Sequence, residues 1–295
     1  MIDSIKGLGT ALVTPFTDTF EVDMDALRRL VAMQIAGGAD YLVVLGTTGE
    51  AVTMTADERQ KVANSIIVQN NGRLPLVLGL GGNCTSDVVR QLTEQSEWIG
   101  KHFAAILSVC PYYNKPSQEG LYQHFVEVGK ASPVPVILYN VPGRTGVNLL
   151  PETAIRIYEA CPEKVAGIKE ASGNMEQIKH LIALSNQQTD GNLLVISGDD
   201  GLAAAIMQAG GAGLISVAAN AFPHIFRQIV HQADSKLQAR TEELVHLLFK
   251  EGNPAGIKTV LSQMGLICNR LRLPLVPNSE SVQHEIAVLL SNLNF

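Results

Sequence analysis

The chain has 295 residues, of which 46% are hydrophobic and 17% charged, a balance that excludes a disordered protein. Its 22 basic and 28 acidic residues give a formal charge of −6, and no block of basic residues occurs, so we do not expect a nucleic-acid surface. Aromatic residues make up only 5%, which argues against a stacking platform for single strands.

Eight short runs rich in Val, Ile and Leu recur along the chain, and most begin roughly 30 positions after the one before. Each run is nearly continuous in its apolar character rather than alternating, which is typical of parallel strands buried on both faces. The predicted strands are 9–16, 40–47, 74–82, 103–113, 135–142, 165–172, 193–200 and 212–220.

Helical patterns lie between these runs. An apolar stripe over 27–35 ends at Gly37 and Gly38, which indicate a helix stop. Thr55 is a candidate N-cap, and Pro151 suits the first turn of another helix. Eight strands that alternate with helices favour an α/β fold, a (β/α)₈ TIM barrel, over a doubly wound sheet.

About 75 residues follow the last predicted strand, more than one barrel helix requires. Segments near 223–250, 254–268 and 278–293 have helical patterns. We therefore predict a catalytic barrel over 1–224 and a C-terminal helical region, an appendix to the barrel, over 225–295.

Several features of the sequence predict a cytoplasmic protein. The first residues have no long apolar run behind them, so we expect no signal peptide and no membrane association. The four cysteines, Cys84, Cys110, Cys161 and Cys268, form no C-x-x-C and no zinc spacing. Free thiols of this kind suit a reducing compartment.

In a TIM barrel the active site lies at the carboxyl ends of the strands. The seven histidines fall before strands, in helices or in the C-terminal region, so we predict no metal site. Asp199 and Asp200 are adjacent at one strand end, and we interpret them as a helix N-cap and a first-turn acid.

Lys169 lies near the end of the apolar run 165–172. A charge inside a barrel is costly, and removal from water favours the neutral amine, which is a nucleophile and can form a Schiff base with a carbonyl. The alternative is a structural lysine paired with a carboxylate such as Glu170. A second Gly-Ile-Lys ends at Lys258, in the predicted helical region, and we interpret that lysine as structural.

Three hydroxyl groups follow other strands. Tyr139 ends the fifth strand, next to the strand of Lys169, and a phenol there can exchange protons with a carbonyl oxygen. Thr47 and Tyr113, at the ends of the second and fourth strands, extend a possible chain of hydroxyl groups. The alternative for each is a hydrogen-bonded core hydroxyl.

These segments closely resemble the 4-hydroxy-tetrahydrodipicolinate synthase (dihydrodipicolinate synthase) family of pyruvate-dependent class I aldolases, which is related to N-acetylneuraminate lyase. The resemblance spans nearly the whole chain in order. It rests on the segments GTTGE at 46–50, PYYNKPSQEG at 111–120, YNVPGRTG at 139–146, GIKEASG at 167–173, SGDD at 197–200 and ISV at 215–217.

The resemblance implies condensation of pyruvate with L-aspartate 4-semialdehyde, the first committed step of lysine biosynthesis through diaminopimelate, without a cofactor. Lys169 would form the imine and Tyr139 would transfer protons, with Thr47 and Tyr113 in the relay. The substrate-binding positions implied are Thr48, with the Ile215 main chain and Gly198 nearby, for the pyruvate carboxylate, and Arg144 for the carboxylate of the aldehyde.

The family also implies an oligomer, a tetramer built as a dimer of dimers, in which Tyr113 reaches the neighbouring subunit's site. The positions that match the lysine-binding pocket of inhibited relatives are Ala51, Ala56, Arg59, Asn83, Asp87 and Tyr112. An arginine near a cationic lysine would be repulsive, so we predict weak or absent feedback by lysine.

The sequence leaves two other functions open. A sibling lyase acting on a sialate or another 2-keto acid would share the lysine, but Arg144 and the pair Tyr112-Tyr113 argue against it. A barrel retained only for binding or regulation would not require a nucleophile on a strand.

Overall fold

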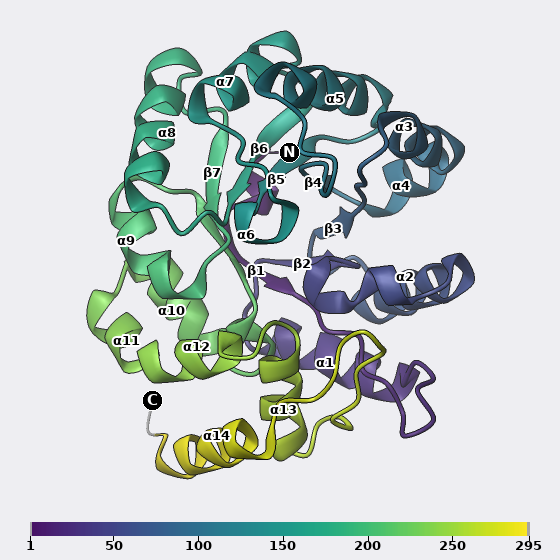
Figure 1. The fold of residues 1–295 in the computed structure, drawn as a ribbon, viewed down its shortest axis with the longest axis vertical. Coiled ribbons are helices and arrows are strands. Elements are labelled where there is room, and N and C mark those ends of the chain that lie inside the picture. The colour runs from purple at the N-terminus through teal and green to yellow at the C-terminus, as the bar shows by residue number, and fades with distance from the viewer. Residues whose placement is uncertain (1, 294–295) are drawn as a thin grey trace.

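The computed structural model describes residues 2–293 as helices, strands and connecting loops (Figure 1). The eight strands are β1 Gly7–Ala11, β2 Tyr41–Val44, β3 Leu76–Gly79, β4 Ala105–Val109, β5 Val136–Asn140, β6 Val165–Glu170, β7 Leu194–Ser197 and β8 Gly213–Ser216. The helices are α1 Met24–Ala36, α2 Ala56–Asn70, α3 Thr85–Glu94, α4 Ser96–His102, α5 Gln118–Ala131, α6 Pro142–Thr145, α7 Pro151–Ala160, α8 Met175–Gln188, α9 Ala203–Gln208, α10 Pro223–Gln232, α11 Ser235–Arg240, α12 Glu242–Phe249, α13 Ala255–Gln263 and α14 Glu280–Asn292.

The strands form a closed barrel in sequence order, β1 to β8, and β8 pairs with β1 in parallel. The (β/α)₈ prediction is therefore confirmed. The observed strands are shorter than the predicted runs, because residues beyond the strand ends are also buried at the mouth of the barrel. Leu12 and Val13 after β1, and Cys110 after β4, are at most 2% exposed although they lie outside the strands.

The helix ends follow the local signals in the sequence. Helix α1 ends before Gly37, and Gly38 has a φ of +81°, a conformation that glycine adopts without a Cβ clash. Thr55 caps α2 and forms a capping box with Glu58, and Pro151 occupies the first turn of α7.

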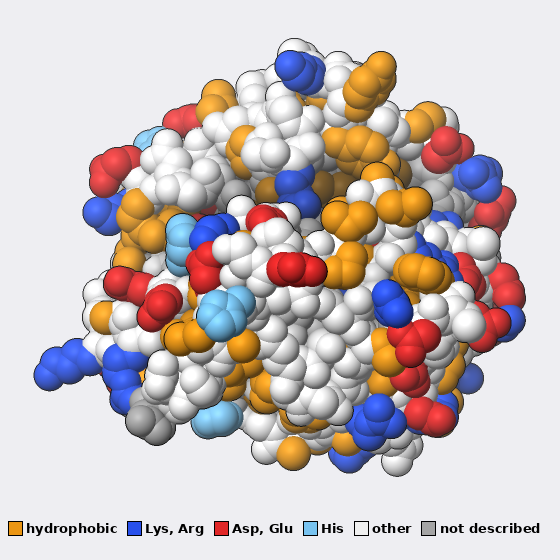
Figure 2. All heavy atoms as spheres, turned by 60° about the horizontal axis from the view of Figure 1, so that its bottom comes forward, with side chains coloured by type: hydrophobic (Ala, Val, Ile, Leu, Met, Phe, Trp, Pro, Cys, Tyr) orange, Lys and Arg blue, Asp and Glu red, His pale blue; other side chains and the backbone are white. Residues whose placement is uncertain are grey.

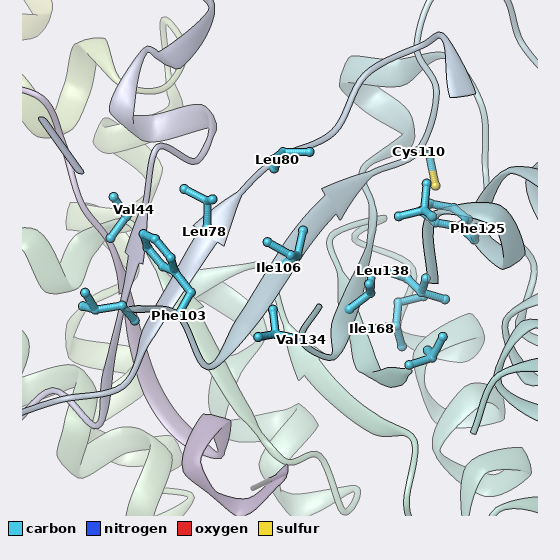
Figure 3. Packing of buried hydrophobic residues seen from close by; sticks show 14 of the residues in the cluster. Val44, Leu78, Leu80, Phe103, Ile106, Cys110, Phe125, Val134, Leu138 and Ile168 are labelled. Atoms are coloured by element: carbon cyan, nitrogen blue, oxygen red, sulfur yellow. The ribbon is translucent and has the colours of Figure 1, made fainter. Parts of the chain in front are cut away.

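Apolar side chains pack against both faces of the strands and form two layers. One layer fills the barrel interior and includes Tyr41, Val77, Leu107, Ile137 and Ile215. The other lies between the strands and the helices, and Figure 3 shows five of its members on successive strands from β2 to β6. These are Val44, Leu78, Ile106, Leu138 and Ile168. The interior of the barrel is thus a packed core.

The C-terminal region is helical, as predicted. Helix α10 packs on β1 and β8 as the eighth barrel helix, and α12, α13 and α14 pack on one another. In Figure 1, α13 and α14 lie together at the lower edge of the molecule. The division into units at residue 224 stays a prediction. In the described part of the chain, no helix has the length and apolar character that a bilayer span requires.

Candidate active site

Lys169 lies inside the barrel because of an irregularity in β6. The pairing of β5 with β6 shifts from Val136 opposite Val165 to Ile137 opposite Gly167, so β6 carries one extra residue, Ala166. A regular alternation starting from the interior Ala166 would direct Lys169 toward the helices. The bulge reverses this alternation and turns the side chain of Lys169 inward, where the residue is only 6% exposed.

Tyr139 is the immediate neighbour of this amine. It pairs with Lys169 across β5 and β6, and the Lys169 Nζ lies 4.3 Å from the centroid of the Tyr139 ring. Tyr139 is 7% exposed and belongs to the interior layer of the barrel. A phenol and an amine are therefore held side by side in a site with restricted access to water.

The alternative that Lys169 pairs with Glu170 does not match the structure. Glu170 is buried and accepts hydrogen bonds from the Asn140 Nδ2 (2.9 Å), the Ser172 N–H (2.8 Å) and the Gln177 Nε2 (3.3 Å). Among the described residues, no carboxylate lies within 4 Å of the Lys169 Nζ. Within the described structure, Lys169 therefore has no acidic partner at ion-pair distance.

A cavity of about 540 Å³ opens beside Tyr139. Thr47, Arg144, Ala51, Arg59 and Tyr112 also line it. Its lining contains two arginines and, within the described residues, no aspartate or glutamate. A cavity with this charge attracts carboxylate ligands. Figure 2 shows a hollow on one face of the molecule, bordered by hydrophobic side chains and a basic side chain.

Gly198 follows β7 and lies against Lys169. Its N–H donates to the Glu170 carbonyl oxygen (2.7 Å). A Cβ at this position would approach the Cβ of Ala171 to 2.6 Å and the Cε of Lys169 to 3.0 Å. The absence of a side chain at Gly198 therefore gives Lys169 the space that it occupies.

Thr48 and Ile215 are both buried close to the strand ends. Thr48 lies in the 3₁₀ turn η2 (Thr47–Gly49) after β2 and is 3% exposed, whereas Ile215 lies in β8 within the interior layer. Neither residue lines the cavity of Thr47 and Tyr139. The Thr48 Oγ1 accepts a hydrogen bond from the Nδ2 of Asn253 (3.0 Å), a residue of the C-terminal region.

Tyr113 is not brought together with the other hydroxyl groups in this chain. Its side chain is 88% exposed, and its backbone has a φ of +74°. Such a conformation is uncommon for a bulky residue, and it is held by a hydrogen bond from the Tyr113 N–H to the Thr145 carbonyl oxygen (3.3 Å). Thr47 and Tyr139 line one cavity, whereas Tyr113 is not among the residues that line it.

The positions matched to a lysine pocket are only partly gathered. Ala51, Arg59 and Tyr112 line the cavity, and the Asn83 Nδ2 donates to the Tyr112 carbonyl oxygen (3.2 Å). Asp87 instead forms a surface ion pair on α3. Its partner is Arg90, at 3.2 Å. Ala56 and Arg59 line a second cavity, of about 510 Å³, between α2 and α3.

The paired acids after β7 have a structural role. Asp199 caps a 3₁₀ turn by accepting from the Gly201 N–H (2.8 Å). Asp200 is buried and accepts hydrogen bonds from the Ser216 hydroxyl and the Val217 N–H. Burial raises the pKa of Asp200 to about 6 in spite of these bonds. In the part of the chain that is described, no group of three or more His, Cys, Asp or Glu side chains could hold a metal ion.

Two features near the site were not predicted from the sequence. One is Asn253, which contacts both Thr48 and Arg144. The other is a buried ion pair between Glu50 and Lys258. Glu50 belongs to the GTTGE segment, but the sequence holds no signal that links this segment to residues about 200 positions later.

A closed parallel barrel with a buried amine at a strand's carboxyl end, beside a phenol, defines a class of enzymes that form a Schiff base with a carbonyl substrate. Residues 4–293 match the Dihydrodipicolinate synthetase family, and the chain belongs to this family.

Individual relatives agree with this assignment. The chain is 47% identical to the 4-hydroxy-tetrahydrodipicolinate synthase of Parabacteroides distasonis, over 99% of this chain and 98% of that one. It is 45% identical to the protein of the same name from Flavobacterium psychrophilum, over 98% of each chain. The solved dihydrodipicolinate synthase of Thermotoga maritima superposes with a TM-score of 0.92 at 39% identity, over 97% of this chain and 98% of that one. The family predicted from the sequence is thereby confirmed, and these names favour it over a sibling lyase.

Proposed function

We propose that this protein condenses pyruvate with L-aspartate 4-semialdehyde to give 4-hydroxy-tetrahydrodipicolinate, through an imine between pyruvate and Lys169. Family membership supports the reaction. The single observation that supports the residue is the position of Lys169, inside the barrel and beside Tyr139, with no carboxylate partner among the described residues.

The first step joins the Lys169 Nζ to the carbonyl carbon of pyruvate. The neutral amine adds to the carbonyl to give a carbinolamine, and loss of water gives the imine. The Tyr139 hydroxyl group supplies the proton that the departing oxygen takes up, and it recovers a proton from the nitrogen. Thr47, which lines the same cavity, extends this proton path.

The imine makes the pyruvate methyl group acidic, and loss of one proton gives an enamine. The enamine carbon attacks the aldehyde carbon of the semialdehyde and forms the new carbon–carbon bond. The amino group of the semialdehyde then attacks the imine carbon, which closes the ring and releases Lys169 as the free amine. No atom of a metal or organic cofactor enters this sequence of steps.

Two groups bind the substrate carboxylates in this proposal. The Thr48 hydroxyl group, with the Ile215 main chain and Gly198 nearby, receives the carboxylate of pyruvate. Arg144 lines the cavity and has the planar guanidinium group that binds a carboxylate through two parallel hydrogen bonds. The absence of acids from the described lining of this cavity supports the same assignment.

We also propose that the active form is an oligomer, a tetramer arranged as a dimer of dimers. The 88% exposed Tyr113 would enter the site of a neighbouring copy and join its proton relay there. A large, exposed aromatic side chain on a constrained backbone is suited to such a contact. Free rather than disulfide-bonded cysteines support a cytoplasmic location.

The reaction is tested by measuring pyruvate consumption with and without L-aspartate 4-semialdehyde. We expect consumption only when both are present, and its loss in Lys169→Ala. We expect Arg144→Ala to raise the KM for the semialdehyde at least ten-fold while the KM for pyruvate changes little, because a charged hydrogen-bond pair is lost. Consumption of pyruvate with a different aldehyde, and none with the semialdehyde, would contradict the proposal and indicate a sibling lyase.

A further inference from the structure

Asn253 links the C-terminal region to the two carboxylate-binding positions of the barrel. It precedes α13 and is 7% exposed. Its Nδ2 donates to the Thr48 Oγ1 (3.0 Å), and its backbone carbonyl oxygen accepts from the Arg144 Nη2 (3.2 Å). One residue thus contacts both the group assigned to pyruvate and the group assigned to the semialdehyde.

The bond to Thr48 sets the direction of a hydroxyl proton. A threonine hydroxyl group has one proton to donate and two lone pairs that accept. Because the Asn253 amide occupies a lone pair, the Thr48 proton stays available to donate to another acceptor, such as a substrate carboxylate. The opposite amide atom, the Asn253 Oδ1, is buried and has no hydrogen-bond partner among the described residues.

Lys258 contacts Glu50, the residue that follows the same turn. Its Nζ forms an ion pair with Glu50, and both side chains are completely buried. The Nζ also donates to the Arg270 carbonyl oxygen (2.9 Å) and lies 4.1 Å from the centroid of the Phe16 ring. The ammonium group is therefore enclosed by the Glu50 carboxylate, a carbonyl and an aromatic face.

Glu50 is the residue at which the η2 turn ends. It has a φ of +52°, in the left-handed region, and its N–H donates to the Thr47 carbonyl oxygen (3.2 Å). Its second carboxylate oxygen accepts from the Arg272 N–H (3.2 Å). The turn that carries Thr47 and Thr48 is thus attached to the C-terminal region at two points, at Thr48 through Asn253 and at Glu50 through Lys258.

A buried ion pair contributes little net stability, because both charges lose their hydration. Stability alone therefore gives no strong reason for the Glu50–Lys258 pair. The pair instead fixes the position of Glu50, a residue with a left-handed backbone conformation next to the site. The pair of Lys250 with Glu285, also in the C-terminal region, instead lies at the surface, with both side chains more than one third exposed.

We propose that Asn253 and Lys258 are positioning residues through which the C-terminal helical region holds Thr48 and Arg144 in place for substrate binding. The inference rests on the proposed function, since it assumes that Thr48 and Arg144 bind the substrate carboxylates. It assigns a role in substrate binding to a region outside the barrel strands. Neither residue contacts the reacting atoms in this role.

The Asn253 contact is tested with Asn253→Ala and Asn253→Asp. We expect Asn253→Ala to raise the KM for pyruvate about ten-fold, while saturating pyruvate still gives full trapping of the Lys169 adduct by borohydride. Asn253→Asp should raise the KM for pyruvate further. The new carboxylate would accept a hydrogen bond from the Thr48 hydroxyl group, which then cannot donate to pyruvate, and its negative charge would repel the pyruvate carboxylate. A KM for pyruvate within about two-fold of the wild-type value in both variants would overturn the role of Asn253.

The Lys258 contact needs a second variant, because Lys258→Met leaves the Glu50 charge buried and unpaired. The double variant Glu50→Gln/Lys258→Met removes both charges. Its melting temperature should therefore return from the lowered value of Lys258→Met toward that of the wild-type protein, whereas its KM for pyruvate should stay above the wild-type value. Recovery of both quantities would overturn the positioning role of Lys258. Lys250→Met, which breaks the surface pair, is the matched control and should leave the KM unchanged.

The wild-type protein separates this inference from the proposed function. If wild-type protein forms no pyruvate adduct, the assignment of Lys169 fails, and with it the basis of the inference. If wild-type protein forms the adduct and the variants bind pyruvate normally, only the positioning roles fail.

Discussion

The Lys169 Nζ lies 4.3 Å from the centroid of the Tyr139 ring, and the two residues are paired in register on neighbouring strands. This arrangement depends on the bulge in β6, which turns Lys169 to the same side of the sheet as Tyr139. The amine and the phenol therefore lie side by side on adjacent strands, where the proposed reaction requires both to act on one substrate carbonyl, and the backbone rather than a flexible loop fixes their separation.

Tyr139→Phe removes the phenolic hydroxyl group and keeps the ring that packs beside Lys169. We expect kcat to fall about 100-fold or more, because proton transfer to and from the carbinolamine oxygen loses its donor. Trapping of the pyruvate adduct should become slower yet reach completion. Tyr158→Phe, on α7, is the matched control. A Tyr139→Phe enzyme with wild-type kcat would contradict the assigned role.

Gly198→Ala tests whether the space beside Lys169 matters. The added Cβ would come to 2.6 Å from the Ala171 Cβ and 3.0 Å from the Lys169 Cε, so Ala171 must shift and the lysine must give way slightly. A displacement of about 1 Å can lower a rate by about 100-fold, and we expect kcat to fall by at least ten-fold. Gly100→Ala serves as control, since its Cβ would meet nothing closer than 3.8 Å. Steady-state kinetics that are equal in both variants would argue against a tightly fitted Lys169.

Much of the fold follows from the sequence because the signals are local. Continuous apolar runs at a regular interval predict a parallel barrel, and the helix stop at Gly37 and the N-cap at Thr55 are set by their own neighbours. The strand that carries Lys169 could be located in the same way. Each of these conclusions needs only residues that are close in the chain.

The direction of Lys169 could not be predicted, since a one-residue bulge reverses every later side chain of β6 and leaves no mark in the apolar pattern. The contacts of Asn253 with Thr48 and of Lys258 with Glu50 join residues about 200 positions apart. Such contacts depend on how the C-terminal region packs on the barrel, and the spacing of apolar residues along the chain does not predict this packing.

Lysine is expected to inhibit weakly or not at all. In the described structure Arg59 has no acidic partner within 4 Å, and its guanidinium group donates only to the carbonyl oxygens of Ala51 (3.3 Å) and Met54 (3.4 Å). Its positive charge would oppose a cationic ligand in the cavity that Tyr112 also lines. A titration of the steady-state rate with lysine checks this. Half-inhibition below about 1 mM, or ~4 kcal/mol of binding, would show the prediction to be wrong.

His124 makes the stability depend on pH. Its ring is buried in α5, with the Nδ1 2.9 Å from the Thr85 hydroxyl oxygen, and burial lowers the pKa of His124 from its usual 6.5 to about 4. Between these values the unfolded chain binds more protons than the folded one, so the free energy of unfolding falls as the pH drops below 6.5.

We expect this histidine to remove about 2 kcal/mol of stability between pH 7 and pH 5. His124→Gln should therefore lose less stability over that interval than the wild-type protein in urea unfolding. His180→Gln is the control, because His180 is exposed and pairs with Glu152 at the surface. Equal pH dependence in the wild-type and His124→Gln proteins would contradict the prediction.

The most direct test of the central claim is reduction of the protein with borohydride in the presence of pyruvate, followed by peptide mass mapping. The prediction is a single reduced pyruvyl adduct on Lys169, absent from Lys169→Met, with the second buried lysine, Lys258, unmodified. An adduct on Lys258 or another lysine, or no adduct in a protein that consumes pyruvate and the semialdehyde, would contradict the assignment of Lys169 as the nucleophile.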